Sequence, residues 1–417
     1  MYNLIEREYI MNFIKKYKNF LSDMILNMIG FGIYIVSQQI LLLPILSKLV
    51  DDNIYSSIVL YISILNVICN VTGGELGNVR LVRDSEYKEK NVIGDFTRIL
   101  IMLSPIITII AIPIFLYLKY SIIGSILFTI TILMANVRLY STCFYRLEKN
   151  FYKVIIQNVF YLIGIIISLI IFKIFNNIYL LLFIPEIISI VYAIKNSDLL
   201  KMKFIKTIEM KNTIKKFFQL GFVSFLTNMM NYFDKFLIYP MFGATSVAVY
   251  YAVNSMSKIA SLITNPMSSV ILSWVSNESG EKQKNKILKT TLISNIPILL
   301  IVTIITIPLT YISLKILYSK YINDAMILIL PISITTAFGT ASTLVKSVLL
   351  KYSNTNKLVF TYISYFVVFA ILGFVFSKNY GLVGFTIANL ISKIFLWILF
   401  IVLLITSSKR NVLTNEN

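Results

Sequence analysis

The chain has 417 residues, of which 57% are apolar and only 14% are charged, so an ordinary soluble globular protein is excluded and an integral membrane protein is indicated. The net charge of +19 would suit nucleic acid only if the basic residues gathered on one solvated face, whereas they are spread between apolar runs. Because there is no histidine, histidine-based catalysis and histidine metal sites are also excluded.

The two cysteines and the N-terminus add few constraints. Cys69 and Cys143 fall within apolar runs, where a thiol packs as a small apolar group, and they suggest neither a disulfide nor a metal site. The N-terminus has no signal-peptide pattern, and Met11 is an alternative start to Met1. No metal or cofactor is expected.

Apolar segments follow one another along the whole chain. A membrane-spanning helix needs about 20 mostly apolar residues, and twelve segments reach or come close to that length. They are 21–45, 54–76, 97–118, 121–143, 154–175, 178–194, 217–241, 247–275, 287–312, 325–350, 358–377 and 381–405. Cytoplasmic loops are enriched in Lys and Arg, and alternate loops here are richer in them, apart from one close pair around the tenth segment. The sequence therefore predicts an all-α membrane protein with twelve transmembrane helices and both termini in the cytoplasm.

The longest basic connection, 195–216, divides the chain into two predicted lobes of six helices, 1–194 and 217–417. Within it, KFIKTIEMKNTIKKFF places apolar residues among lysines, as an amphipathic helix at the cytoplasmic membrane surface would. NFIKKYKNFLSDM near the N-terminus has the same character. Since each lobe has an even number of helices, any internal duplication is a parallel repeat.

Polar residues recur at three- and four-residue spacing on the first two helices of each lobe, so these helices carry polar stripes. The stripes include Asn27, Tyr34, Gln38, Asn66, Asn70, Asn228, Asn231 and Asn254. Such a face is unsuited to lipid and predicts a wet passage. Asp234 and Lys235 are also in this set, but adjacent helical residues point about 100° apart, so we expect no ion pair between them.

Charged residues inside the predicted helices are mostly basic. They are Arg98, Arg138, Lys235, Lys258, Lys346 and Lys393 against Glu186 and Asp234. A charge at a helix centre costs about 2.5–3.5 kcal/mol, so it usually faces a cavity or a partner. Arg98, Lys346 and Lys393 have stems that could reach a membrane surface, while Lys258 and Asp234 favour a cavity. The excess of cations predicts a passage for an anionic substrate, and Arg138 is suited to bidentate phosphate binding.

Two N-terminal runs carry a family resemblance. SQQILLLPILSKL and NVTGGELGNVRLVRD, with Gly73, Gly74, Gly77, Asn78 and Arg80, resemble the Wzx-type polysaccharide or O-antigen flippases of the multidrug/oligosaccharidyl-lipid/polysaccharide (MOP) exporter superfamily. The resemblance implies a MATE-like fold and a transporter rather than an enzyme. It also implies alternating-access translocation of an undecaprenyl-diphosphate-linked oligosaccharide from the inner to the outer leaflet of the bacterial cytoplasmic membrane.

The same resemblance implies roles for individual residues. The diphosphate would meet Lys258, Arg138 and Lys235, and sugars would meet the asparagines, Tyr34 and Gln38 of the polar stripes. Asp234 and Glu186 would be candidates for a coupling cation, and Arg80 for a cytoplasmic gate. The expected partners are the lipid-linked oligosaccharide, membrane lipids and other polysaccharide assembly proteins, with no nucleic acid.

Two alternative functions stay open. A MATE-like multidrug or cation antiporter shares the architecture, but a cavity for cationic drugs should contain acidic residues, and the buried cations argue against it. An integral-membrane polysaccharide polymerase or acyltransferase would need a large external loop or a catalytic cluster, whereas the outer loops are short. The sequence does not indicate which sugar repeat is moved, or whether it belongs to O-antigen or capsule.

Overall fold

The computed structural model describes residues 22–23, 25–83, 94–201, 206–277, 281–353 and 355–409, and within these ranges the chain forms helices and no β-strand. The predicted all-α class is therefore confirmed for the described part of the chain. The amphipathic segment expected near the N-terminus lies mostly outside these ranges, as do residues 202–205 of the expected linker.

The first two apolar segments form long helices that each contain one π-helical turn. The first, Ile25–Leu49, contains η1 (Ser37–Leu42) and α2 (Leu43–Leu49). The second, Asp52–Arg83, consists of α3 (Asp52–Cys69), η2 (Asn70–Gly74) and α4 (Glu75–Arg83). Pro44 of α2 cannot donate a backbone hydrogen bond, so the turn before it must change its pattern, and η1 is that turn.

Four further helices follow in the N-terminal part of the chain. They are α5 (Gly94–Tyr117), α6 (Ile122–Leu147), α7 (Phe151–Phe175) and α8 (Leu180–Asn196), followed by the 3-10 turn η5 (Asp198–Lys201). Asn176 ends α7 in the left-handed conformation that suits asparagine, and its backbone N–H donates to the carbonyl of Phe172. A short connection of this kind returns the chain directly from α7 into α8.

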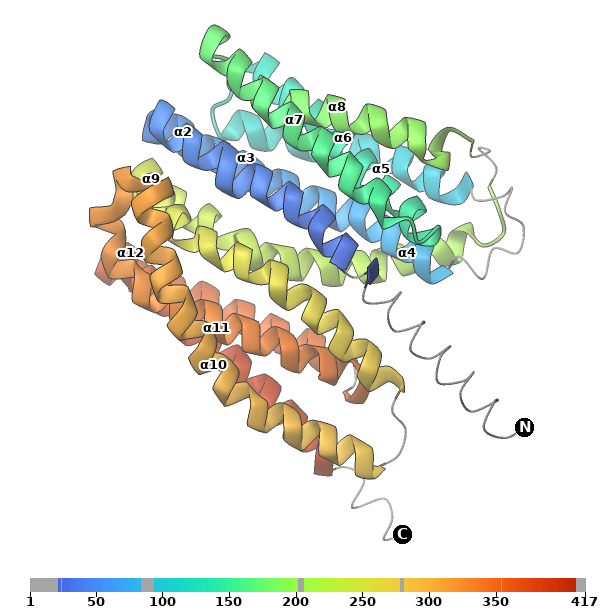
Figure 1. Cartoon of the computed structure of the whole chain (residues 1–417), viewed down its shortest axis with the longest axis vertical. Coiled ribbons are helices and arrows are strands. Elements are labelled where there is room, and N and C mark those ends of the chain that lie inside the picture. Colours follow the sequence, from blue (N-terminus) through green and yellow to red (C-terminus); the bar gives the residue numbers. More distant parts are fainter. Residues whose placement is uncertain are drawn as a thin grey trace. The chain divides into compact units, whose positions relative to one another are not determined.

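The C-terminal part contains four long helices and one short turn, and two of the helices have an internal break. They are α9 (Met210–Asn277), α10 (Glu281–Leu317), the 3-10 turn η6 (Ser319–Tyr321), α11 (Ile322–Tyr352) and α12 (Thr355–Lys409). The helical backbone breaks at Gly243 in α9 and at Gly381 in α12, both with positive φ. Glycine adopts this conformation without a Cβ clash. The chain turns back within α9 (Figure 1), where the sequence predicted the end of one span and the start of the next.

Nine helices in the described part of the chain are long and apolar enough to cross a membrane. This confirms a multi-pass membrane protein. The count is lower than twelve because α9 and α12 each count once although each continues through a break, and because α8, with 17 residues, is too short to be counted. The count of twelve spans and the cytoplasmic placement of both termini stay predictions.

The chain forms two compact units. Unit 1 contains the described residues up to Leu42 together with Tyr61–Asn228, and unit 2 contains Leu43–Leu60 together with the residues from Met229 onward. The chain thus passes from one unit to the other within the first span, within the second span and within α9. The predicted lobes at 1–194 and 217–417 stay a prediction, since these units follow different boundaries.

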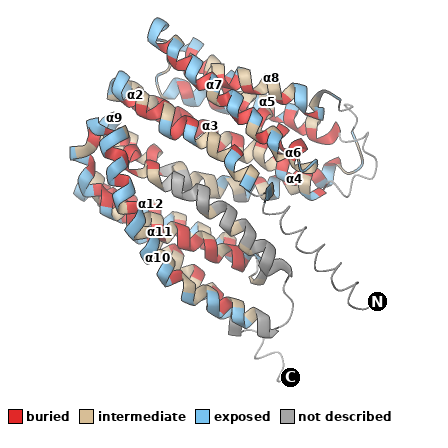
Figure 2. Cartoon of the chain, in the orientation of Figure 1, coloured by how far each residue is buried: buried red, intermediate tan, exposed pale blue. Residues whose placement is uncertain are grey.

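Many apolar side chains lie on the outer surface of the described helices, whereas a few charged side chains are buried. In α10, Leu300 and Ile304 are 60% and 68% exposed, and Figure 2 shows little of this helix buried. By contrast, Arg138 and Glu186 of unit 1 and Lys235 of unit 2 are buried. A helix facing lipid has this outward apolar surface, so the few buried charged residues are the place to look for a functional site.

Candidate functional site

An ion pair joins two helices in the interior of unit 1. Nε of Arg138, in α6, lies 2.7 Å from Oε2 of Glu186 in α8, and Nη2 lies 3.0 Å from Oε1. The exposed fractions of the two residues are 5% and 0%. The pair is bidentate, the geometry in which a guanidinium and an oxyanion bind most strongly.

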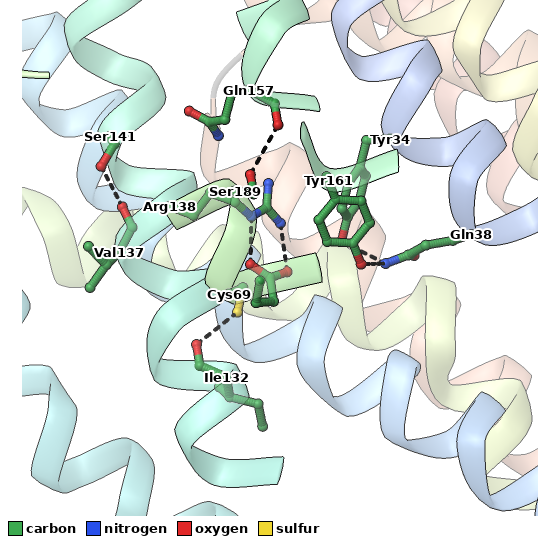
Figure 3. Close-up of polar contacts among 11 residues, drawn as sticks. Tyr34, Gln38, Cys69, Ile132, Val137, Arg138, Ser141, Gln157, Tyr161 and Ser189 are labelled. Carbon is green, nitrogen blue, oxygen red and sulfur yellow. Dashed lines mark hydrogen bonds and ion pairs between the residues drawn. The ribbon is translucent and has the colours of Figure 1, made fainter. Parts of the chain in front are cut away.

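Two neighbouring tyrosines lie against the guanidinium. The Cζ atom of Arg138 lies 4.9 Å from the ring centroid of Tyr34 and 5.1 Å from that of Tyr161. Nε2 of Gln38 donates to both tyrosine hydroxyls, at 3.0 Å and 2.9 Å, and Figure 3 shows these four side chains together. We call Tyr34, Gln38, Arg138, Tyr161 and Glu186 the arginine cluster.

Small residues and helix distortions bring the cluster together. Gln38 belongs to the π turn η1, and such turns are frequent at functional sites. Glu186 follows Pro185, and a Cβ on Gly164 of α7 would overlap with that proline, so α7 and α8 can approach this closely only with glycine there. The Ser189 hydroxyl of α8 also donates to the backbone carbonyl of Gln157 in α7 at 3.1 Å.

Sequence reasoning named four of the five cluster residues but not their arrangement. Arg138 was predicted to bind diphosphate and Glu186 to bind a coupling cation, and the structure pairs the two. Tyr161 was not predicted. Its signal in the sequence was weak, because one tyrosine in an apolar helix is usually a packing residue. The cluster is electrically balanced, so Arg138 can bind another anion only if Glu186 is neutralised or displaced.

A second ion pair lies in unit 2, and here the sequence prediction was wrong. Nζ of Lys235 lies 2.5 Å from Oδ1 of Asp234, although no pair was expected between adjacent residues. The expectation used the directions of the Cα–Cβ bonds, but the four-carbon stem of lysine lets its ammonium group fold back onto the neighbouring carboxylate. Asn254 donates to Oδ2 of Asp234 at 3.3 Å. Lys235 is fully buried.

The remaining predicted polar residues are divided among several places. Nδ2 of Asn70 donates to Oδ1 of Asn228 at 2.9 Å within unit 1. Asn27 and Asn66 are half-buried. The side chains of Asn231 and Lys258 lie outside the described part of the structure, so their predicted roles stay predictions.

Arg80, predicted as a cytoplasmic gate, is buried among aromatic side chains of unit 1. Its guanidinium lies 4.0 Å from the ring centroid of Phe144, and Nη1 lies 3.2 Å from the hydroxyl of Tyr140. The neighbouring Arg83 binds Glu209 at 2.7 Å and Thr213 at 2.9 Å. Arg83 thereby fixes the start of α9 to α4, while the gating role of Arg80 stays a prediction.

Comparison with known proteins adds the class of fold. No protein-family model and no curated protein sequence matches the chain. Solved structures do match, at 12–15% sequence identity, and several are transporters of the MOP superfamily. The chain therefore has the fold of these transporters, and the MATE-like fold that the resemblance implied is confirmed.

Two particular structures illustrate the match. The lipid II flippase MurJ in an inward closed conformation has a TM-score of 0.68 and 15% identity over 93% of this chain and 87% of its own. An outward-facing multidrug resistance MATE family transporter has a TM-score of 0.67 and 14% identity over 96% and 97%. At these identities the likeness establishes the fold, and the two matches do not choose between a lipid-linked substrate and a drug.

Proposed function

We propose that this protein is a flippase that moves a polyprenyl-diphosphate-linked oligosaccharide from the inner to the outer leaflet of the bacterial cytoplasmic membrane. The observation that carries the proposal is the arginine cluster, in which a buried guanidinium already holds an oxyanion through two hydrogen bonds. The same planar fork fits a phosphate. MurJ, whose fold this chain shares, is described as a lipid II flippase.

In the proposed mechanism, the substrate diphosphate replaces Glu186 as the anionic partner of Arg138. Breaking a buried ion pair without a replacement leaves an uncompensated charge, which is strongly unfavourable. Glu186 therefore releases Arg138 only when a proton or another cation neutralises its carboxylate. On this account Glu186 is a cation site that controls substrate binding, because its charged carboxylate competes with the substrate for Arg138. An alternating-access movement carries the bound diphosphate across.

The other predicted site residues are assigned by the same logic. Asp234 is a second candidate for a coupling cation, and Lys235 and Lys258 are further candidates for the diphosphate. The polar-stripe residues, including Asn70 and Asn228, are proposed contacts for the sugars, because amide groups supply both donors and acceptors to hydroxyls. Other polysaccharide assembly proteins are proposed partners.

The test changes each member of the Arg138–Glu186 ion pair in turn and measures export of the lipid-linked oligosaccharide. Arg138→Lys keeps the charge but loses the two-point geometry, and we expect outer-leaflet lipid-linked oligosaccharide to fall by about tenfold or more, since bidentate binding is worth at least about 1.4 kcal/mol. Glu186→Gln mimics the neutralised carboxylate, so the diphosphate should bind but no longer be displaced by Glu186, and export should also fall. The measurement is the oligosaccharide accessible to an externally added lectin in a flippase-deletion strain, at matched membrane protein levels.

A matched control uses an exposed ion pair of the same unit. Lys153 and Glu148 are 2.7 Å apart and partly exposed, so Lys153→Met and Glu148→Gln should leave export unchanged. Full export by both arginine-cluster variants would contradict the proposal. Linked sugars that reach the outer leaflet but stay unpolymerised would instead indicate the polymerase alternative.

The drug-antiporter alternative is distinguished by substrate charge. The MATE structures match this chain about as well as MurJ does, so the choice depends on the site. Arg138, Lys235, Lys346 and Lys393 outnumber Glu186 and Asp234 inside the predicted spans, which favours an anionic substrate. Resistance to cationic drugs conferred by the protein, without export of lipid-linked sugar, would support the antiporter.

A further inference from the structure

Two lysines inside the apolar helices of unit 2 have aromatic neighbours and, in the described part of the structure, no acidic ones. Nζ of Lys346, in α11, lies 5.2 Å from the ring centroid of Tyr362, and Nζ of Lys393, in α12, lies 4.8 Å from that of Tyr365. Both lysines are half-buried. Among the residues that the structure describes, neither ammonium group has an ion-pair or hydrogen-bond partner.

This environment differs from that of the other enclosed lysine of unit 2. Lys235 is neutralised by Asp234 at 2.5 Å, and even the partly exposed Lys320 is paired with Asp52 at 2.7 Å. A cation–π contact offsets only part of the cost of removing an ammonium group from water. Lys346 and Lys393 therefore carry positive charge that no described side chain compensates.

The two lysines contact tyrosines at neighbouring positions of one helix. Tyr362 and Tyr365 are three residues apart on the first arm of α12, so their side chains lie on the same face. Lys346 approaches this face from α11, and Lys393 approaches it from the second arm of α12, beyond the break at Gly381. Two ammonium groups from different helices thus converge on one aromatic surface.

Two buried hydroxyls nearby also lack partners. Within the described part of the chain, the hydroxyl of Tyr365 and that of Ser342 are buried and accept or donate no hydrogen bond, and the two residues are 1% and 3% exposed. Ser342 precedes Lys346 by four residues in α11, so both lie on one face of that helix. A buried hydroxyl without a partner is unfavourable and calls for a ligand or water.

We propose that Lys346, Lys393, Tyr365 and Ser342 form a binding site for a phosphoryl group within unit 2. All four can donate hydrogen bonds, two carry positive charge, and no described acidic side chain contacts either lysine, so the chemistry selects an anion. The phosphoryl group belongs either to an anionic lipid headgroup or to a prenyl diphosphate. If the ligand is an anionic lipid, the site lies outside the flippase function; if it is a prenyl diphosphate, the site rests on the proposed function and adds a second contact for its substrate. In either case binding in unit 2 does not depend on the arginine cluster.

The test measures protection of individual lysines in the full-length protein. Purified protein in phosphatidylcholine nanodiscs is acylated with a lysine reagent, and the modification rates of Lys346 and Lys393 are followed by peptide mass spectrometry. The exposed Lys315 of α10 is the internal control. One arm adds farnesyl diphosphate or farnesol, a second adds inorganic pyrophosphate, and a third replaces part of the lipid with phosphatidylglycerol.

We expect farnesyl diphosphate or phosphatidylglycerol to slow modification of Lys346 and Lys393 together, with Lys315 and the farnesol arm unchanged. The arm that protects identifies the source of the phosphoryl group. Tyr365→Phe, which keeps the ring and removes the hydroxyl, should raise the concentration needed for protection by about tenfold, as expected for loss of a hydrogen bond to a charged group. It should not lower the unfolding temperature without ligand.

Unchanged rates at both lysines in every arm would overturn the proposal, as would protection that Tyr365→Phe leaves unaltered. Neither result bears on Arg138 or Glu186. Failure of this site is therefore distinguishable from failure of the flippase proposal, which is read from oligosaccharide export.

Discussion

Lys235 illustrates how far the head of a long side chain can lie from the direction of its Cα–Cβ bond. Its ammonium group is fully buried and reaches the carboxylate of the preceding residue, Asp234, which also accepts from Asn254. Two charges that would each be costly inside an apolar unit therefore compensate one another. Two charged residues that are each unfavourable inside an apolar helix therefore form a neutral pair in the structure.

A double-mutant cycle tests this pair. Lys235→Met or Asp234→Asn alone leaves a buried charge without its partner, and each should destabilise the protein by about 3–5 kcal/mol. Asp234→Asn combined with Lys235→Met removes both charges and should recover most of that loss. The measurement is the thermal unfolding of detergent-purified protein, and additive effects of the two substitutions would show that the charges do not interact.

Sequence reasoning was effective at this scale where a residue's neighbours along the same helix decided the outcome, and ineffective where packing did. Tyr34 and Gln38 are four residues apart, so their shared face was predictable, and Gln38 donates to Tyr34. Arg138 and Glu186 are 48 residues apart in the chain. Their contact depends on how α6 packs against α8, and no periodicity in the sequence encodes that packing.

The π turn η2 of the second span packs directly against the backbone of α6. A Cβ added to Gly73, in η2, would overlap with the backbone carbonyl oxygen of Asn136 and with its side-chain oxygen. Thr72 donates to the same side-chain oxygen at 2.7 Å. Because backbone cannot move aside as a flexible side chain can, this contact between helices requires glycine.

Gly73→Ala should therefore destabilise the protein by about 1–3 kcal/mol, the usual cost of overpacking. Gly339→Ala is the matched control, because Gly339 is also helical, and no atom would lie within 4 Å of its Cβ. Alanine there should be neutral or stabilising by up to about 1 kcal/mol. Comparison of the two unfolding temperatures distinguishes a local clash from a general effect of alanine.

The start of α9 carries a pH-sensitive connection to α4. Hydrogen bonds from Asn212 and Arg83 hold the pKa of Glu209 below its usual value of 4.5. A carboxyl group whose pKa is lowered in the folded state stabilises the protein above its usual pKa, and this contribution is lost as the pH falls through the lowered value. Glu209 lies just before the apolar stretch that begins at Met210, where water can reach it.

Glu209→Gln should accordingly lower the unfolding temperature at neutral pH, and its difference from the unmodified protein should begin to shrink as the pH falls below about 4.5 and vanish below the lowered pKa of Glu209. Unfolding is followed by intrinsic fluorescence from pH 3 to pH 7 for both proteins. A difference that stays constant over this range would indicate that the substitution acts through packing and that the ion pair with Arg83 contributes nothing.

Across the whole molecule, exposed apolar side chains and a few buried charged ones occur in both units. This much was predictable, because hydrophobic length fixes which segments can cross a membrane and polar stripes show which helices avoid lipid. The number of spans was harder to verify, since α9 and α12 each contain a break, at Gly243 and Gly381, and each can be counted as one helix or as two. The boundaries of the two units were not predictable, because they depend on contacts and not on loop length.

The proposed substrate predicts how transport responds to the membrane. Outward movement of negative charge is assisted by an inside-negative potential by about 2.3 kcal/mol per charge per 100 mV. Glu186 needs only to bind and release a proton, and that proton does not have to cross the membrane with the substrate. Flipping should therefore depend weakly on a proton gradient when the potential is held fixed. Proteoliposomes with ionophore-clamped potential and varied pH difference provide the measurement, and a strict requirement for the gradient would contradict it.

The passage of the chain between units has a consequence for separated fragments. Leu43–Leu60 belongs to unit 2 although it precedes most of unit 1, and the described residues from Lys206 to Asn228 belong to unit 1 although they precede most of unit 2. A polypeptide severed between Lys201 and Lys206 therefore yields two pieces that each lack part of a unit. Each piece made alone should be degraded, and only co-expression of both should restore a stable, co-purifying protein.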